Sequence, residues 1–155
     1  MSLNLPLQRP LRHTGAKKAE ARTQFAVLPW RVVDGKVRIC LVTSRGTRRW
    51  ILPKGWPMDR TTPAEAAAIE AWEEAGLSGE VDHQPLGLYS YRKLIGEDAI
   101  PVIAVVYVMR VIDIADDYPE SDQRKRKWLS RKKAADRLED PELSHIVRHF
   151  VAPVG

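Results

Sequence analysis

The sequence has little cysteine, few aromatic residues and no long hydrophobic run. Cys40 is the only cysteine among 155 residues, which excludes an internal disulfide and a metal site built from several cysteines. No run approaches the roughly 20 consecutive apolar residues of a membrane-spanning helix, and the most apolar stretch, residues 100–112, contains Arg110. We therefore expect no membrane partner. Because a single cysteine fits a reducing compartment, we expect a cytoplasmic location.

Positive charge is in surplus, with 25 Lys and Arg against 20 Asp and Glu and a net charge of +5. This surplus favours anionic partners such as phosphates, nucleotides or nucleic acid. Residues 1–23 contain five of the basic residues but no apolar stretch behind them, so they do not read as a secretory signal. We expect this segment to be a basic, flexible arm and residues 24–155 to form a single domain.

Apolar and β-branched runs predict the strands. The first two runs are separated by Asp34-Gly35, a dipeptide favoured in two-residue hairpin turns. Cys40 lies in the second run and is expected to pack as a small apolar residue. The last run is apolar on both faces, as in a central strand covered by helices. The predicted strands span residues 25–33, 36–43, 50–53, 86–94 and 100–112.

The clearest predicted helix begins after Thr62. Thr62 and Glu65 have the spacing of a capping box, Pro63 suits the first helical position, and Gly76 is placed to end the helix. Strands outnumber helices, and this helix lies between two sheet-forming halves. The fold class is therefore predicted to be a mixed α/β or α+β sandwich. Shorter helices are predicted over residues 131–138 and 142–151.

Three carboxylates crowd one arc of this helix. Glu70, Glu73 and Glu74 lie together at about 100° per residue, whereas Trp72 lies opposite and is expected to pack in the core. Like charges at these spacings destabilise a helix, and no Lys or Arg within it offsets them. Oxygen ligands of this kind suit a hard divalent cation. A solvated acidic surface is the alternative.

From Gly55 to Leu77 the chain resembles the Nudix box, GX5EX7REUXEEXGU, in which U is a bulky aliphatic residue. The strand and loop before the box and the order of the flanking elements extend the likeness from residue 25 onward. The Pro53-Lys54-Gly55 lead-in is similar to that of the branch hydrolysing diadenosine and diphosphoinositol polyphosphates. The matching box residues are Gly55, Glu70, Glu73, Glu74, Gly76 and Leu77.

The resemblance implies a fold, a cofactor and a reaction. It implies an α/β/α sandwich with a mixed central sheet and hydrolysis of a diphosphate linkage, here in a dinucleoside or diphosphoinositol polyphosphate. It also implies Mg²⁺ or Mn²⁺ held by Glu70, Glu73, Glu74 and the Gly55 carbonyl. Glu70 or Glu73 is the implied general base. Outside the box, Glu97 and Glu120 are candidates for a further ligand or base.

Two box positions depart from the pattern. Thr61 stands where the first glutamate is expected, and Ile69 replaces the arginine before Glu70. In the family that arginine helps to orient the carboxylates, so Ile69 leaves the helix without an internal cation. The alternative function is therefore a catalytically weak or silent Nudix-fold module that binds a nucleotide, polyphosphate or RNA.

Substrate recognition has to come from residues outside the box. Lys54, Arg45 and Arg49 are the leading candidates, because several cations suit a substrate with three or more phosphates. Further candidates are cations and aromatic residues near predicted loops or strand ends. These are Arg48, Arg92, Lys93, Trp56, Tyr89 and Tyr91.

Two basic stretches, residues 124–127 and 131–133, raise RNA as another partner. Trp128 is the only aromatic residue beside them, which favours a solvated or phosphate-steering surface over RNA binding. We expect a small polyphosphate substrate as the main partner, and a monomer or a homodimer.

Overall fold

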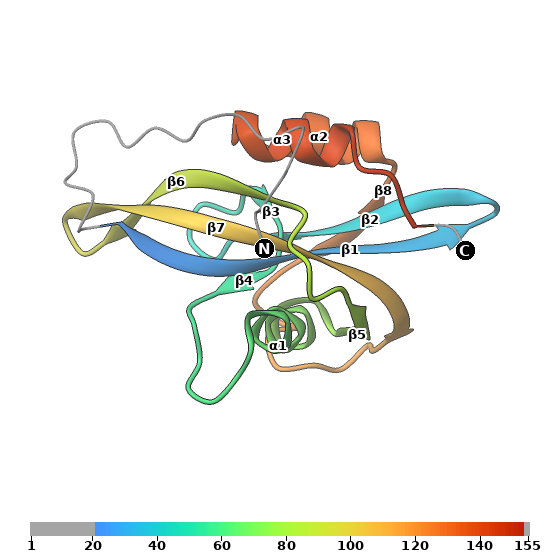
Figure 1. Ribbon diagram of the computed structural model, residues 1–155, viewed down its shortest axis with the longest axis horizontal. Helices are drawn as coiled ribbons and strands as arrows, with labels where there is room; N and C mark the ends of the chain where they lie inside the picture. Colours follow the sequence, from blue (N-terminus) through green and yellow to red (C-terminus); the bar gives the residue numbers. More distant parts are fainter. Residues whose placement is uncertain (1–20, 154–155) are drawn as a thin grey trace.

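The computed structural model describes residues 21–153, which form eight strands and three helices (Figure 1). Most of the predicted N-terminal arm, residues 1–20, lies outside the described residues. The elements are β1 (Arg22–Val33), β2 (Lys36–Thr43), β3 (Trp50–Ile51), β4 (Lys54–Gly55), α1 (Pro63–Ala75), β5 (Leu77–Val81), β6 (Gly87–Ile95), β7 (Asp98–Ile114), β8 (Arg126–Leu129), α2 (Arg131–Arg137) and α3 (Pro141–Arg148).

The strands form one mixed sheet in which β1 and β7 run parallel and the other pairs are antiparallel. The main path is β3-β2-β1-β7-β5, with β4 added to β1, β6 to β7 and β8 to β2. Helices α2 and α3 cover one face of the sheet and α1 covers the other (Figure 1). The predicted α/β/α sandwich with a mixed central sheet is confirmed.

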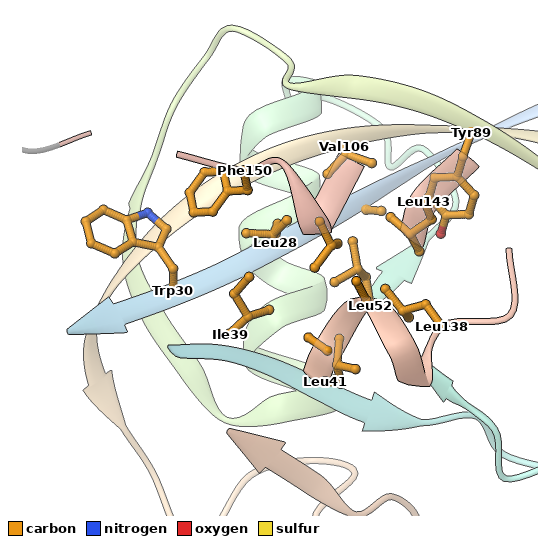
Figure 2. Packing of buried hydrophobic residues seen from close by; sticks show 14 of the residues in the cluster. Leu28, Trp30, Ile39, Leu41, Leu52, Tyr89, Val106, Leu138, Leu143 and Phe150 are labelled. Carbon is orange, nitrogen blue, oxygen red and sulfur yellow. The ribbon is translucent and has the colours of Figure 1, made fainter. Parts of the chain in front are cut away.

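Alternation along the central strands divides the core into two layers. Leu28 and Ile39 contribute to the layer beneath α2 and α3, whereas Val27 and Cys40 belong to the layer beneath α1. Figure 2 shows the first layer, in which Trp30 packs near Phe150 with ring centroids 6.4 Å apart. Cys40 is fully buried, as expected, and burial raises the pKa of its thiol to about 12.

Local sequence signals gave accurate boundaries where they were strong. Both capping-box hydrogen bonds between Thr62 and Glu65 are present, and Gly76 ends α1 in the left-handed conformation with φ at 67°. The Asp34-Gly35 turn joins β1 to β2. The final helix ends at Arg148, earlier than predicted. Strands β4, β5 and β8 were not predicted.

No helix within residues 21–153 has both the length and the apolar character needed to cross a membrane.

The prediction that Trp72 packs in the core was wrong. Trp72 is 41% exposed, whereas Glu70 and Glu74 are buried on the side of the helix that faces the sheet. Alanine makes up the rest of that buried side, and its small side chain allows the helix to lie close to the strands. The acids therefore point into the fold. The buried alanines are Ala64, Ala66, Ala67, Ala71 and Ala75.

A comparison of two glycines tests the close contact between the end of α1 and Tyr118. Gly76 and Gly96 both have positive φ, but a Cβ at Gly76 would overlap the Tyr118 ring, whereas a Cβ at Gly96 would meet open space. Each alanine variant loses about 1–2 kcal/mol of stability through backbone strain. We expect Gly76→Ala to lose at least about 1 kcal/mol more than Gly96→Ala, because Tyr118 must also move. Urea unfolding measures both, and equal losses would contradict this account.

Candidate active site

A cleft of about 760 Å³ opens where α1 meets β4 and the loop between β2 and β3. Its walls also come from β6 and from the segment between β7 and β8. The leading site candidates from the sequence are all lining residues of this one cleft. They are Arg45, Arg49, Lys54, Gly55, Glu70, Glu73 and Glu74.

The secondary candidates are divided by the structure. Glu120, Tyr91 and Lys93 line the cleft, together with Arg92 and Trp56. Glu97, Arg48 and Tyr89 are not among its lining residues, and Tyr89 is a core residue. Thr61 is also absent from the lining, and its hydroxyl donates a hydrogen bond of 2.8 Å to the Met58 carbonyl in the turn before α1.

Gly55 and Glu70 are in close contact at the base of the cleft. A Cβ atom on Gly55 would overlap the Glu70 carboxylate, so a larger residue at this position of β4 would displace that carboxylate. Burial, followed by the neighbouring charges of Glu74 and Glu73, raises the pKa of Glu70 to about 8. Without a cation beside it, Glu70 is therefore largely protonated at neutral pH.

Glu74 lies deeper and has partners on both carboxylate oxygens. Its Oε1 accepts a hydrogen bond of 3.2 Å from the Lys54 backbone N–H, and its Oε2 lies 3.3 Å from Nη2 of Arg124. Burial raises the pKa of Glu74, and the charges of Arg124 and Lys54 oppose that rise. Arg124 also donates from Nε to Oε1 of Glu120 over 3.1 Å.

Arg124 is the site residue that the sequence analysis missed. It lies in the basic stretch 124–127, which was interpreted as a surface, yet its side chain is only 7% exposed. Arg126 also turns inward, and its Nη1 donates to the Ala75 carbonyl over 2.7 Å. Only Lys125 and Lys127 of the stretch are exposed. The spacing of Glu120 and Arg124, four residues apart, was the available signal for an acid–base pair.

Cations also line the cleft. Lys54 Nζ lies 5.1 Å from the centre of the Tyr91 ring, and burial lowers the pKa of Lys54 to about 8. Arg49 forms an ion pair of 3.4 Å with Glu139. Arg45 lies 3.6 Å from Glu120. The cleft thus combines acids from α1 with basic side chains from β4 and the loop between β2 and β3, which suits a polyanion bridged to the acids by a cation.

The same arrangement of box residues marks a known family. A NUDIX domain profile matches residues 22–150. The chain belongs to the Nudix family. Nudix hydrolase 12, mitochondrial, of Arabidopsis thaliana is 31% identical over 103 residues, covering 64% of this chain and 51% of that protein. Nudix hydrolase 16, mitochondrial, of the same plant is 33% identical over 114 residues, covering 70% and 62%.

The chain thus spans about half to three fifths of the length of these plant Nudix proteins. Phosphatase NudJ of Escherichia coli O1:K1 is 27% identical over 120 residues, covering 76% of each chain. Among solved structures, Ap4A hydrolase of C. elegans has a TM-score of 0.59 at 18% identity and covers 83% of this chain and 94% of its own. At this identity the likeness shows the Nudix fold alone.

The donor set of the cleft fits the divalent cations, such as Mg²⁺ or Mn²⁺, that Nudix hydrolases generally use. Glu70, Glu73, Glu74 and the Gly55 carbonyl offer only oxygen atoms, as these hard cations require. Within residues 21–153, no three acidic, histidine or cysteine side chains are already grouped to hold an ion.

The pKa of Glu70 predicts how stability changes with pH when divalent ions are removed by EDTA. Between its ordinary value of 4.5 and about 8, folded Glu70 keeps a proton that the unfolded chain releases. Stability of the Nudix domain therefore falls as pH rises through this window. Glu70→Gln has no such proton, and we expect it to be more stable than wild type by about 1–3 kcal/mol at pH 8 and equally stable near pH 4.5.

Urea unfolding in EDTA across this pH range measures the difference. Glu80→Gln, which changes an exposed glutamate on β5, is the matched control and keeps the wild-type slope. Parallel pH slopes for Glu70→Gln and wild type would show that Glu70 is ionised in the metal-free fold.

Proposed function

We propose that this chain is a divalent-metal-dependent pyrophosphohydrolase acting on a dinucleoside polyphosphate or a diphosphoinositol polyphosphate. The observation that carries the proposal is the joining, in one cleft, of buried acids from α1 with the basic side chains of Lys54, Arg45 and Arg49. The names of the matched relatives support hydrolysis, and an Ap4A hydrolase among the structural neighbours agrees with the substrate class.

The proposed reaction is attack of water on phosphorus with cleavage of a phosphoanhydride bond. A bound Mg²⁺ or Mn²⁺, held by Glu70, Glu73, Glu74 and the Gly55 carbonyl, would neutralise charge on the diphosphate oxygens. Glu73 is less buried than Glu70 and Glu74, so water reaches it most readily. We assign Glu73 to accept the proton of the attacking water. The bond to the leaving phosphate then breaks, and that phosphate departs with the electron pair.

Lys54 and its neighbours hold the polyphosphate. Lys54 remains mainly protonated at neutral pH with a pKa of about 8, and its position over Tyr91 directs the ammonium group into the cleft. Tyr91 and Trp56 offer ring surfaces beside these cations. The residues proposed to act all lie in one chain. We place the reaction in the cytoplasm, because a chain with one buried cysteine suits a reducing compartment.

The alternative of a silent binding module has less support. It was motivated by Thr61 and Ile69, but Thr61 lies outside the lining of the cleft, and Arg124 supplies a cation to Glu74. The RNA alternative was motivated by two basic stretches, and residues 131–133 are exposed on α2, but residues 124–127 do not form a continuous basic surface. Arg124 and Arg126 instead bind within the fold.

Phosphate release from a substrate panel tests the reaction. The panel contains diadenosine polyphosphates, nucleoside triphosphates, nucleotide sugars and diphosphoinositol phosphates, each with Mg²⁺ or Mn²⁺. We expect turnover of the first or last class, and a loss of about 10²–10⁴-fold in kcat in Glu73→Gln. Glu80→Gln is the exposed control and keeps full activity. Ligand binding with no turnover in any class would favour the silent module.

Lys54→Gln tests the assignment of the phosphate-binding wall. Loss of a charge-assisted contact costs about 1.5–3 kcal/mol, so we expect KM for the polyphosphate to rise roughly 10–100-fold. Wild-type KM also rises as pH increases through about 8, where Lys54 loses its proton, and this dependence is absent from the variant. Lys36→Gln, at an exposed position in the hairpin of β1 and β2, is the matched control. An unchanged KM would place the phosphates elsewhere.

A further inference from the structure

Helix α1 concentrates negative charge without a cation of its own. Its thirteen residues include Glu65, Glu70, Glu73 and Glu74 but no Lys or Arg, and its last turn has no basic residue. Ile69 occupies the position directly before Glu70. A basic residue there would have placed a positive charge close to the acids. Two of these acids are buried, so compensation from solvent is limited. The balancing charge has to come from another part of the chain.

Arg124 brings that charge from the segment between β7 and β8. Its three nitrogen groups have partners in three parts of the fold. Nη2 lies 3.3 Å from Glu74 on α1, Nε lies 3.1 Å from Glu120 in its own segment, and Nη1 donates over 3.0 Å to the Thr43 carbonyl at the end of β2. The planar guanidinium therefore fixes two carboxylates relative to the sheet.

The other nearby cations do not have this arrangement. Arg45 reaches Glu120 only at 3.6 Å from a side chain that is 63% exposed. Arg126 donates to the Ala75 carbonyl and so holds the end of α1, not its acids. The Lys54 contact with Glu74 is made by the backbone N–H. Arg124 is the buried side chain that links Glu74 to Glu120.

We propose that Arg124 is a positioning residue that supplies the cation missing from α1, holding Glu74 and Glu120 in place beside the cleft for metal binding and hydrolysis. The role rests on the proposed function. Arg124 is not assigned to the substrate, because its side chain is only 7% exposed and all three nitrogen groups have protein partners. Partners of metal-binding carboxylates commonly change metal affinity or activity by about 10–100-fold when they are removed.

The test uses Arg124→Gln, Arg124→Lys and the control Lys125→Gln, which removes an exposed charge from the next position. Mn²⁺ affinity is measured without substrate by electron paramagnetic resonance, and kcat and KM are measured on the best substrate of the panel. We expect Arg124→Gln to weaken Mn²⁺ binding and kcat by about 10–100-fold with KM within about threefold of wild type. Lys125→Gln matches wild type in all three.

Arg124→Lys keeps the charge but loses the fork that spans Glu74 and Glu120, so we expect a smaller loss of both Mn²⁺ affinity and kcat. If Arg124→Gln does not fold, Arg124→Lys is the variant that is compared with wild type. Mn²⁺ binding that is unchanged or tighter in the variants overturns the proposal, since Arg124 would then be neutral or compete with the metal. A rise in KM with constant kcat also overturns it, because it would make Arg124 a substrate contact.

Ile69→Arg provides an independent test of the proposal. If Arg124 already supplies the cation, an arginine added at position 69 gives no gain in Mn²⁺ affinity or kcat. A gain of tenfold or more would show that the charge is still missing, and would overturn the proposal. Because Mn²⁺ binding is measured without substrate, it tests Arg124 even if no substrate of the panel is hydrolysed. Failure of the proposed function and failure of the positioning role are therefore distinct results.

Discussion

The short distance between α1 and the sheet is the constraint on which the site depends. Alanines on the inner side of the helix permit this approach, and Gly55 leaves room for the Glu70 carboxylate against β4. A larger residue at either place would push the acids out toward solvent, where their charges would be screened. Close packing therefore determines the position of these carboxylates and raises the pKa of Glu70 and of Glu74.

Burying acids creates an electrostatic cost that the surrounding fold only partly offsets. Arg124 and the Lys54 amide stabilise the ionised form of Glu74, whereas the largest charges acting on Glu70 are those of other acids. The metal-free cleft is thus balanced at its inner end and deficient in positive charge beside Gly55. In the proposed function, this uneven balance would favour a divalent cation beside Glu70.

The sequence predicted those parts of the structure that local chemistry decides. The capping box at Thr62, the end of α1 at Gly76 and the hairpin turn at Asp34 all depend on neighbouring residues. Short strands such as β8 were missed because their pairing partner lies far away in the sequence. The expected burial of Trp72 was wrong because the acids, and not the largest apolar residue, occupy the buried side of α1. Family resemblance found the acids and Gly55.

The role of Arg124 was not predicted because its partners come together only in the folded chain. The neighbouring contact of Arg126 with Ala75 joins residues 51 positions apart, so the segment docks on α1 by closing a long loop. Contacts of this kind are costly in chain entropy and tend to form late. Packing of α1 against the sheet before this loop closes would leave its acids without their cation, so protons or metal ions in the surroundings would influence how fast the chain folds.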